Sequence, residues 1–199
     1  MSTMNELIVS YYSDGVCIDS ENFVRELLET DISEIREYVV SMPQHEINTY
    51  DIPQYSSYED GTSGMIAFLR MSGNYGPTYC EVGKHFLETG HKEAAYVKYG
   101  ENHSKLAESL GLVRIERDKK RKVYLSDIGK TIEKLDISIQ KECFTKLSMR
   151  IPIIQCALKK QVDNYEALEE LLRLYLSATT ALRRRKNTMD FLIMIEGKK

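Results

Sequence analysis

The sequence predicts a mainly α-helical fold with small β-hairpins and a small N-terminal α/β segment. Three observations predict it. Apolar residues recur at helical spacing over most of the chain, Gly, Pro and Ser separate these runs, and two short alternating segments, "LVRIER" and "RKVYLS", flank a basic turn. The chain has 199 residues, of which 42% are hydrophobic and 29% charged, as in an ordinary soluble globular protein. This length allows one to three small domains.

Residues 1–56 are predicted to form an acidic strand-and-helix segment with a linker. The run "NELIVSYY" has the composition of a strand, and Ser20 can cap a helix through "ENFVRELLE". Asp31 and Glu34 have capping-box spacing ahead of a second helix. From Pro43 to Gly64 polar residues and tyrosines dominate, which indicates a linker or an extended arm.

Residues 57–142 are predicted to fold as a winged helix domain. A short helix through "SGMIAFLRMSG" comes first, and Thr78 with Glu81 forms a capping box for a second helix. After a connection, "HKEAAYVK", a third helix covers Glu101 to Leu110, and the hairpin follows it. Ser126 then caps "DIGKTIEKLDISIQK". Three helices, a two-stranded hairpin and a closing helix are the element order of a winged helix-turn-helix.

Residues 143–199 are predicted to form a second helix-turn-helix unit. The runs "SMRIPIIQCALKK" and "NYEALEELLRLY" are apolar helix patterns, and Ser177 can cap a third helix through "ATTALRRRKNTMDFLIMIEG". The predicted architecture is therefore a tandem of winged helix or helix-turn-helix units.

The charges divide the chain into an acidic head and a basic body. Residues 1–60 hold 13 Asp and Glu against Arg25 and Arg36, whereas residues 61–199 hold 17 acidic and 25 basic residues. The local balance sets the field at a binding face, so the overall net charge of -3 does not exclude nucleic acid as a partner.

The basic stretches have the chemistry of a double-stranded DNA interface. In a helix-turn-helix the second helix of the pair lies in the major groove, and the tip of the wing approaches phosphates. Side chains suited to base edges are those of Lys98, Asn102 and Lys105. Cations suited to phosphates lie in the hairpin turn and the last helix: Arg117, Lys119, Lys120, Arg121, Lys122, Arg183, Arg184, Arg185 and Lys186. Four phosphate contacts would give a slope of log affinity against log salt of about -3.6.

Each basic run also has a structural interpretation. Cations in a hairpin turn commonly form a solvated edge that resists strand pairing. Some side chains of the run from Arg183 to Arg185 can pair with Glu169 or Glu170, or cover apolar surface with their stems.

Catalytic and metal-binding patterns are mostly missing from the sequence. Glu196 and Lys198 have the E-x-K spacing of one nuclease superfamily, with Asp190 ahead of them, but they fall on or after a helix pattern rather than on strands. The histidines and the four separated cysteines lack metal-ligand spacing, so we expect no metal and no cofactor. No apolar run is long enough to span a membrane, and the first residues lack a charged head followed by an apolar segment with a cleavage site, so we expect no membrane contact and a cytoplasmic location.

Two stretches resemble a known family. "KYGENHSKLAESLGLV" followed by "VYLSDIGK" is similar to the winged-helix DNA-recognition domains of restriction endonucleases and to related helix-turn-helix modules of phage defence, and "LSATTALRRRKNTMDFLIMI" is similar to an element that often follows. The similarity covers roughly residues 61–195. It implies DNA binding through Glu101 to Leu110 and through the helix with Arg183 to Lys186, and it implies no catalytic residue.

The sequence thus predicts a non-catalytic, sequence-recognising DNA-binding protein. We expect it to be a recognition or accessory subunit of a restriction-type or phage-defence system, beside a nuclease, methyltransferase or ATPase subunit. One alternative is a homodimeric winged-helix transcriptional regulator, which would bind half-sites about one helical turn apart. The other is a protein-protein interaction module whose acidic head imitates DNA.

Overall fold

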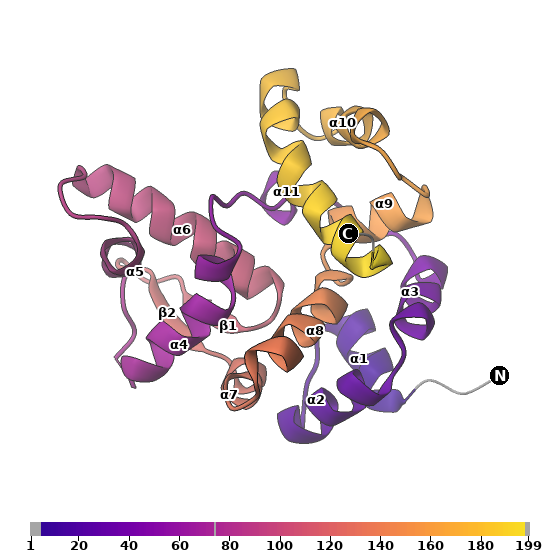
Figure 1. The fold of residues 1–199 in the computed structure, drawn as a ribbon, viewed down its shortest axis with the longest axis horizontal. Helices are drawn as coiled ribbons and strands as arrows, with labels where there is room; N and C mark the ends of the chain where they lie inside the picture. Colours follow the sequence, from indigo (N-terminus) through magenta and orange to yellow (C-terminus); the bar gives the residue numbers. More distant parts are fainter. Residues whose placement is uncertain (1–4, 74, 198–199) are drawn as a thin grey trace. The chain divides into compact units, whose positions relative to one another are not determined.

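The protein folds as two compact units that are mainly helical, with one small antiparallel hairpin among the described residues (Figure 1). The computed structural model describes residues 5–73 and 75–197. Unit 1 comprises Met1–Pro53 and Glu142–Lys199, and unit 2 comprises Gln54–Lys141. The predicted ranges were 1–56, 57–142 and 143–199. The middle range lies close to unit 2, whereas the two outer ranges fold together as unit 1.

The start of unit 1 is helical, so the strand predicted for "NELIVSYY" is wrong. Helix α1 covers Glu6–Asp14, and the Asn5 side chain caps it by accepting a hydrogen bond from the backbone N–H of Leu7 at 2.8 Å. Three side chains at helical spacing, Ile8, Tyr11 and Tyr12, are buried. The β-branched and aromatic composition resembles a strand, but burial follows a period near 3.6 residues, which is that of a helix.

Helices α2 (Ser20–Glu29) and α3 (Ile32–Ser41) begin at aspartate caps. Asp19, not the predicted Ser20, caps α2 by accepting a hydrogen bond from the backbone N–H of Asn22. Asp31 caps α3 by accepting a hydrogen bond from the backbone N–H of Ser33, without the reciprocal contact of Glu34 that the capping-box spacing predicts. These caps satisfy N–H groups that have no partner within the helix.

The C-terminal part of unit 1 contains α8 (Ile137–Ser148, from Glu142 onward), α9 (Pro152–Lys159), α10 (Tyr165–Arg173) and α11 (Ala178–Glu196). Residues 153–158 of α9 are all buried, so α9 is the central helix of the unit. It contacts both α3 and α11, so that segments from the two ends of the chain enclose it (Figure 1).

The predicted linker region is partly packed against unit 1. It contains two short 3-10 helices, Thr49–Asp51 and Glu59–Gly61, and Ile47, Ile52 and Pro53 are buried. A polar, tyrosine-rich composition therefore does not make this whole segment an extended arm.

Unit 2 contains α4 (Ser63–Met71), α5 (Tyr79–Phe86), α6 (Glu93–Ser109), β1 (Val113–Glu116), β2 (Lys122–Leu125) and α7 (Asp127–Glu133), and it ends in the first residues of α8. The strands pair antiparallel, with Val113 opposite Leu125 and Glu116 opposite Lys122. β1 contacts α6, and β2 contacts α4 (Figure 1). Thr78 makes an isolated bridge to Lys122, which adds a third extended segment beside β2.

The capping predictions for unit 2 are confirmed. The Thr78 hydroxyl and the Glu81 carboxylate form a reciprocal capping box at the start of α5. Ser126 caps α7 by accepting a hydrogen bond from the backbone N–H of Gly129 at 2.9 Å. The helix predicted after Ser126 is divided, because α7 ends at Glu133 and α8 begins at Ile137. None of the described helices is long and apolar enough to cross a membrane.

Candidate nucleic-acid interface

Two glycines set the orientation of α6. A Cβ atom on Gly83 of α5 would lie 2.0 Å from the carbonyl oxygen of Tyr96, and one on Gly100 of α6 would lie 1.9 Å from that of Tyr79. No side chain fits at such distances, so the backbones of α5 and α6 are in direct contact where they cross. This contact fixes which face of α6 is buried and which is exposed.

Helix α6 begins at Glu93, and the prediction that it starts at Glu101 is wrong. The stretch "HKEAAYVK", predicted as a connection, supplies two turns of the helix because Ala, Glu and Lys all favour helical backbone. Lys98, Asn102 and Lys105 consequently lie in the middle and the C-terminal half of the helix. Its N-terminal residues, which in a helix-turn-helix lie nearest the base edges, begin eight residues earlier than predicted.

The two predicted base-reading lysines are paired within α6. The Lys98 Nζ lies 3.1 Å from the Glu101 carboxylate, and the Lys105 Nζ lies 2.6 Å from it. Partial burial would raise the pKa of Glu101, but the two ammonium groups outweigh it and hold this pKa below its usual value. Asn102 is half-exposed on the same helix. Two ammonium groups share one carboxylate, so these three side chains keep one positive charge, and the exposed carboxylate of Glu93 balances it along the helix.

The hairpin turn carries two cations that are free of contacts within the described residues. Lys119 and Lys120 are exposed and have neither a hydrogen bond nor an ion pair within the described part of the chain. Arg117 lies 3.5 Å from the carboxylate of Glu108, and three quarters of its side chain is exposed. The tip of the hairpin thus presents positive charge to solvent.

The last two cations of the turn contact aromatic side chains. Burial raises the pKa of Tyr79, and the Arg121 guanidinium beside its hydroxyl opposes this shift. The Lys122 Nζ lies 5.9 Å from the centre of the Tyr75 ring, within cation-π range. Arg121 and Lys122 therefore lie at the turn end of the hairpin, where the neighbouring aromatic side chains contact them.

His103 holds the segment that leads into unit 2. Its Nε2 accepts hydrogen bonds from the backbone N–H groups of Ser57 and Ser56, at 3.2 and 3.4 Å, and its Nδ1 lies 2.8 Å from the Tyr99 carbonyl oxygen. This pattern requires a neutral ring with its proton on Nδ1. Burial lowers the pKa of His103, and the nearby Asp60 carboxylate opposes that shift. The ring is a structural group of the core.

In α11, Arg184 is bound within unit 1. Its guanidinium donates hydrogen bonds to the carbonyl oxygens of Thr49, at 2.9 Å, and Ile52, at 3.0 Å. Burial lowers the pKa of this guanidinium, and the charge of Arg183 lowers it further. Arg184 fixes the segment before Pro53 to α11, which is a structural role.

The other cations of α11 are more exposed but mostly paired. Arg185 lies 2.7 Å from the Glu169 carboxylate, which agrees with the structural interpretation of this run, and Lys186 lies 3.1 Å from Asp190. Arg183 is exposed without an ion-pair partner among the described residues. The four predicted phosphate contacts of α11 thus include one cation that is free.

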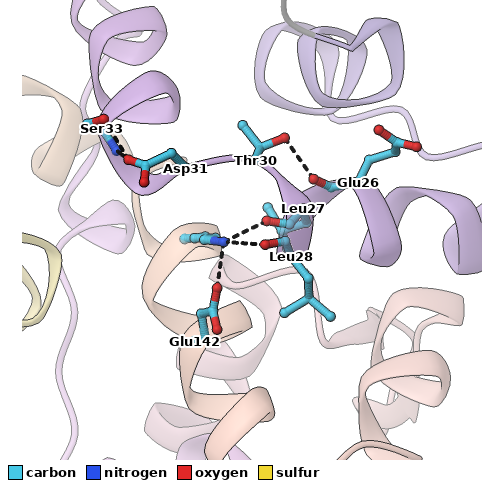
Figure 2. Close-up of polar contacts among 8 residues, drawn as sticks. Glu26, Leu27, Leu28, Thr30, Asp31, Ser33 and Glu142 are labelled. Carbon is cyan, nitrogen blue, oxygen red and sulfur yellow. Dashed lines mark hydrogen bonds and ion pairs between the residues drawn. The ribbon is translucent and has the colours of Figure 1, made fainter.

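A buried lysine in unit 1 forms the other polar cluster, which the sequence analysis missed. Lys146 of α8 donates hydrogen bonds to the carbonyl oxygens of Leu27 and Leu28 at 2.9 and 3.1 Å, and to the Glu142 carboxylate at 2.6 Å, as the dashed lines of Figure 2 show. These carbonyls end α2 and have no partner in that helix, so a cation stabilises them. A pocket of about 450 Å³ lies beside the cluster. All three donors of Lys146 are used, so the cluster is structural.

Catalytic patterns gain no support from the site geometry. The His85 ring stacks on Phe68 at 4.2 Å between centres, and no group of three or more His, Cys, Asp or Glu side chains in residues 5–73 and 75–197 is arranged to hold a metal ion. Glu196 lies 3.9 Å from Arg36, and Lys198 falls outside the described residues.

In comparisons with family models, curated proteins and solved structures, no match was found.

Proposed function

We propose that unit 2 is a winged helix-turn-helix module that binds double-stranded DNA. Helix α4, the extended segment at Thr78, helices α5 and α6, and the β1–β2 hairpin follow one another in the order of that fold. In this proposal α6 enters the major groove, and the turn between β1 and β2 is the wing that contacts a phosphate backbone.

The observation that carries the proposal is the free charge of Lys119 and Lys120. Most other cations of α6 and the hairpin have an acidic or aromatic partner within the protein, whereas these two are exposed at the hairpin tip. A cation without an internal partner can release its counterion and bind a phosphate, and no contact within the protein has to be broken. A wing tip is the part of the fold where such contacts are made.

A titration of labelled duplex DNA tests the proposal. The protein should bind at about 50 mM salt, and log affinity should fall linearly with log salt. Replacing both lysines, Lys119→Gln with Lys120→Gln, should reduce the steepness of this slope by about 1.8, since each phosphate contact contributes about 0.9. The matched control, Arg25→Gln with Lys160→Gln, removes the same charge from exposed positions of unit 1 and should leave the slope unchanged. Absence of binding at 50 mM salt overturns the proposal.

The wider role that we propose is that of a non-catalytic recognition or accessory subunit in a restriction-type or phage-defence system. The support is the resemblance of the α6, hairpin and α7 sequence to recognition domains of that class. Purification of the tagged protein from its native host should then recover a nuclease, methyltransferase or ATPase subunit. A dimer in solution that protects two symmetric half-sites would instead indicate a transcriptional regulator.

Protein binding by α6 is the second candidate function. Its exposed side carries the carboxylates of Glu93, Glu101 and Glu108, which outnumber Lys98 and Lys105. The variant Glu93→Gln separates the candidates. If phosphates lie near the N-terminus of α6, this variant should raise the affinity for DNA. If the helix binds protein, it should leave the affinity for DNA unchanged and lower the affinity for a basic protein partner.

A further inference from the structure

The N-terminal half of α6 presents a small apolar surface that the sequence analysis did not identify. Ala94 and Val97 lie one helical turn apart and are both exposed, with 37% of Val97 accessible to solvent. Together with Glu93, Lys98 and Glu101 they line an open hollow of about 460 Å³. The crossing of α5 and α6 at Gly83 and Gly100 holds this surface outward.

The distribution of charge around this surface matches a DNA groove. On α6 the ammonium groups of Lys98 and Lys105 both lie on the Glu101 carboxylate. The exposed Glu93 carboxylate supplies a second negative charge, so these two lysines and two glutamates together carry no net charge. In the hairpin, Lys119 and Lys120 are exposed without an ion pair among the described residues, and Lys92, just before the first turn of α6, is exposed in the same way. Base edges are uncharged, whereas phosphates are anionic. A helix face without net charge, with cations in the neighbouring hairpin, therefore fits a groove between two phosphate backbones.

We propose that Ala94 and Val97 recognise the C5-methyl groups of pyrimidines, those of thymine above all, in the major groove. This inference rests on the proposed DNA-binding function and names the residues that select its target. The C5-methyl group is the apolar feature of a base-pair edge in that groove, and small aliphatic side chains are its partners. The two residues lie in the first turns of the helix, where a helix-turn-helix reads base edges.

Replacement of thymine by uracil isolates the contact. Uracil keeps every hydrogen-bonding group of thymine and lacks only the methyl group. The full-length protein first selects duplexes from a library with a random central sequence. The affinity for each selected duplex is then compared with that for the same duplex with uracil in place of one thymine. For at least one thymine, uracil should weaken binding about 3- to 10-fold, the effect of one methyl group removed from an apolar contact.

Protein variants then assign the effect to α6. Val97→Ser should bring the ratio of thymine to uracil affinity near 1 while changing affinity for the uracil duplex less than about 2-fold. Because the side chain is exposed, this variant should melt at the temperature of the wild type. The variant Lys119→Gln with Lys120→Gln should lower the affinity for the thymine duplex and for the uracil duplex by the same factor, because phosphate contacts do not distinguish between bases.

The failures are distinguishable. No binding of any duplex at about 50 mM salt overturns the proposed function, and this inference with it. Binding without an enriched sequence, or with equal affinity for thymine and uracil at every position, overturns the inference alone. Loss of a protein partner by Val97→Ser, with DNA affinity unchanged, overturns it and assigns the surface to protein binding.

Discussion

The hairpin turn of unit 2 and helix α11 of unit 1 carry similar runs of positive charge, yet their side chains have opposite surroundings. In the turn, Lys119 and Lys120 are exposed and free of internal contacts. In α11, Arg184 binds two backbone carbonyls and Arg185 binds Glu169. A run of cations in a sequence therefore indicates neither a binding surface nor a structural role, since the packing around each side chain decides between them.

The difference also separates two energetic roles. A cation that donates to buried carbonyls contributes to folding, because its removal leaves acceptors without a partner. A free cation at a hairpin tip contributes little to folding and remains available to an anionic partner. Three predictions test this division, beginning with the buried Lys146, and one on His103 extends it to a buried neutral side chain.

Replacement of Lys146 should have the largest effect on stability. Lys146→Met keeps most of the side-chain volume but leaves the carbonyls of Leu27 and Leu28 without their donor, so we expect a loss of about 3 kcal/mol in the free energy of unfolding. Urea denaturation measures it. Lys160→Met, at an exposed position, is the control and should change stability by less than about 0.5 kcal/mol. A loss as small as that of the control would show that water replaces the lysine.

Replacement of Arg184 should cost less. Arg184→Met removes the hydrogen bonds to Thr49 and Ile52, and we expect a loss of about 2 kcal/mol because only part of this site is shielded from water. The neighbouring Arg183→Met, at an exposed position, should be nearly neutral in the same urea titration. Equal effects of the two variants would remove the distinction between structural and free cations in α11.

His103 should make the stability of unit 2 depend on pH. Burial lowers the pKa of His103 in the folded protein below that of an unfolded histidine, which is about 6.5. The unfolded chain therefore binds more protons as the pH falls, and the contribution to stability, complete above about pH 6.5, is lost progressively below it.

Denaturation by urea between pH 5 and pH 8 measures this loss. His103→Gln should flatten the curve, whereas His91→Gln, at an exposed position, should keep the wild-type shape. A wild-type curve that is already flat over this range would show that His103 has the same pKa in both states.

Neutralisation of Lys119 and Lys120 should have the smallest effect on stability and the clearest effect on the proposed DNA binding. Lys119→Gln with Lys120→Gln should change the free energy of unfolding by less than about 0.5 kcal/mol. The corresponding change in α11, Arg185→Gln with Lys186→Gln, replaces two cations that are paired with Glu169 and Asp190, and it should leave the salt dependence of the proposed DNA binding as it is in the wild type. If the α11 variant instead reduced the slope by about 1.8, both basic runs would contact phosphates, and the contrast between them would fail.

Local signals in the sequence determined much of unit 2. The capping box of Thr78 and Glu81, the cap at Ser126 and the alternating strands around a basic turn all act within a few residues, so their positions could be predicted and are confirmed. The mainly helical structure and the β1–β2 hairpin follow from such signals. The start of α6 could also have been found from the high helix propensity of "KEAAYVK", had it been weighed against the expectation of a loop.

Tertiary structure alone decided the rest. The sequence does not reveal that residues 1–53 fold with residues 142–199, because that grouping depends on side chains that are far apart in the chain. For the same reason, it does not show that Lys146 reaches the end of α2 or that Arg184 reaches Ile52. The charge of a side chain is local, but the acceptor that binds it is brought near only by the fold, and this is why Lys119 remains free while Arg184 does not.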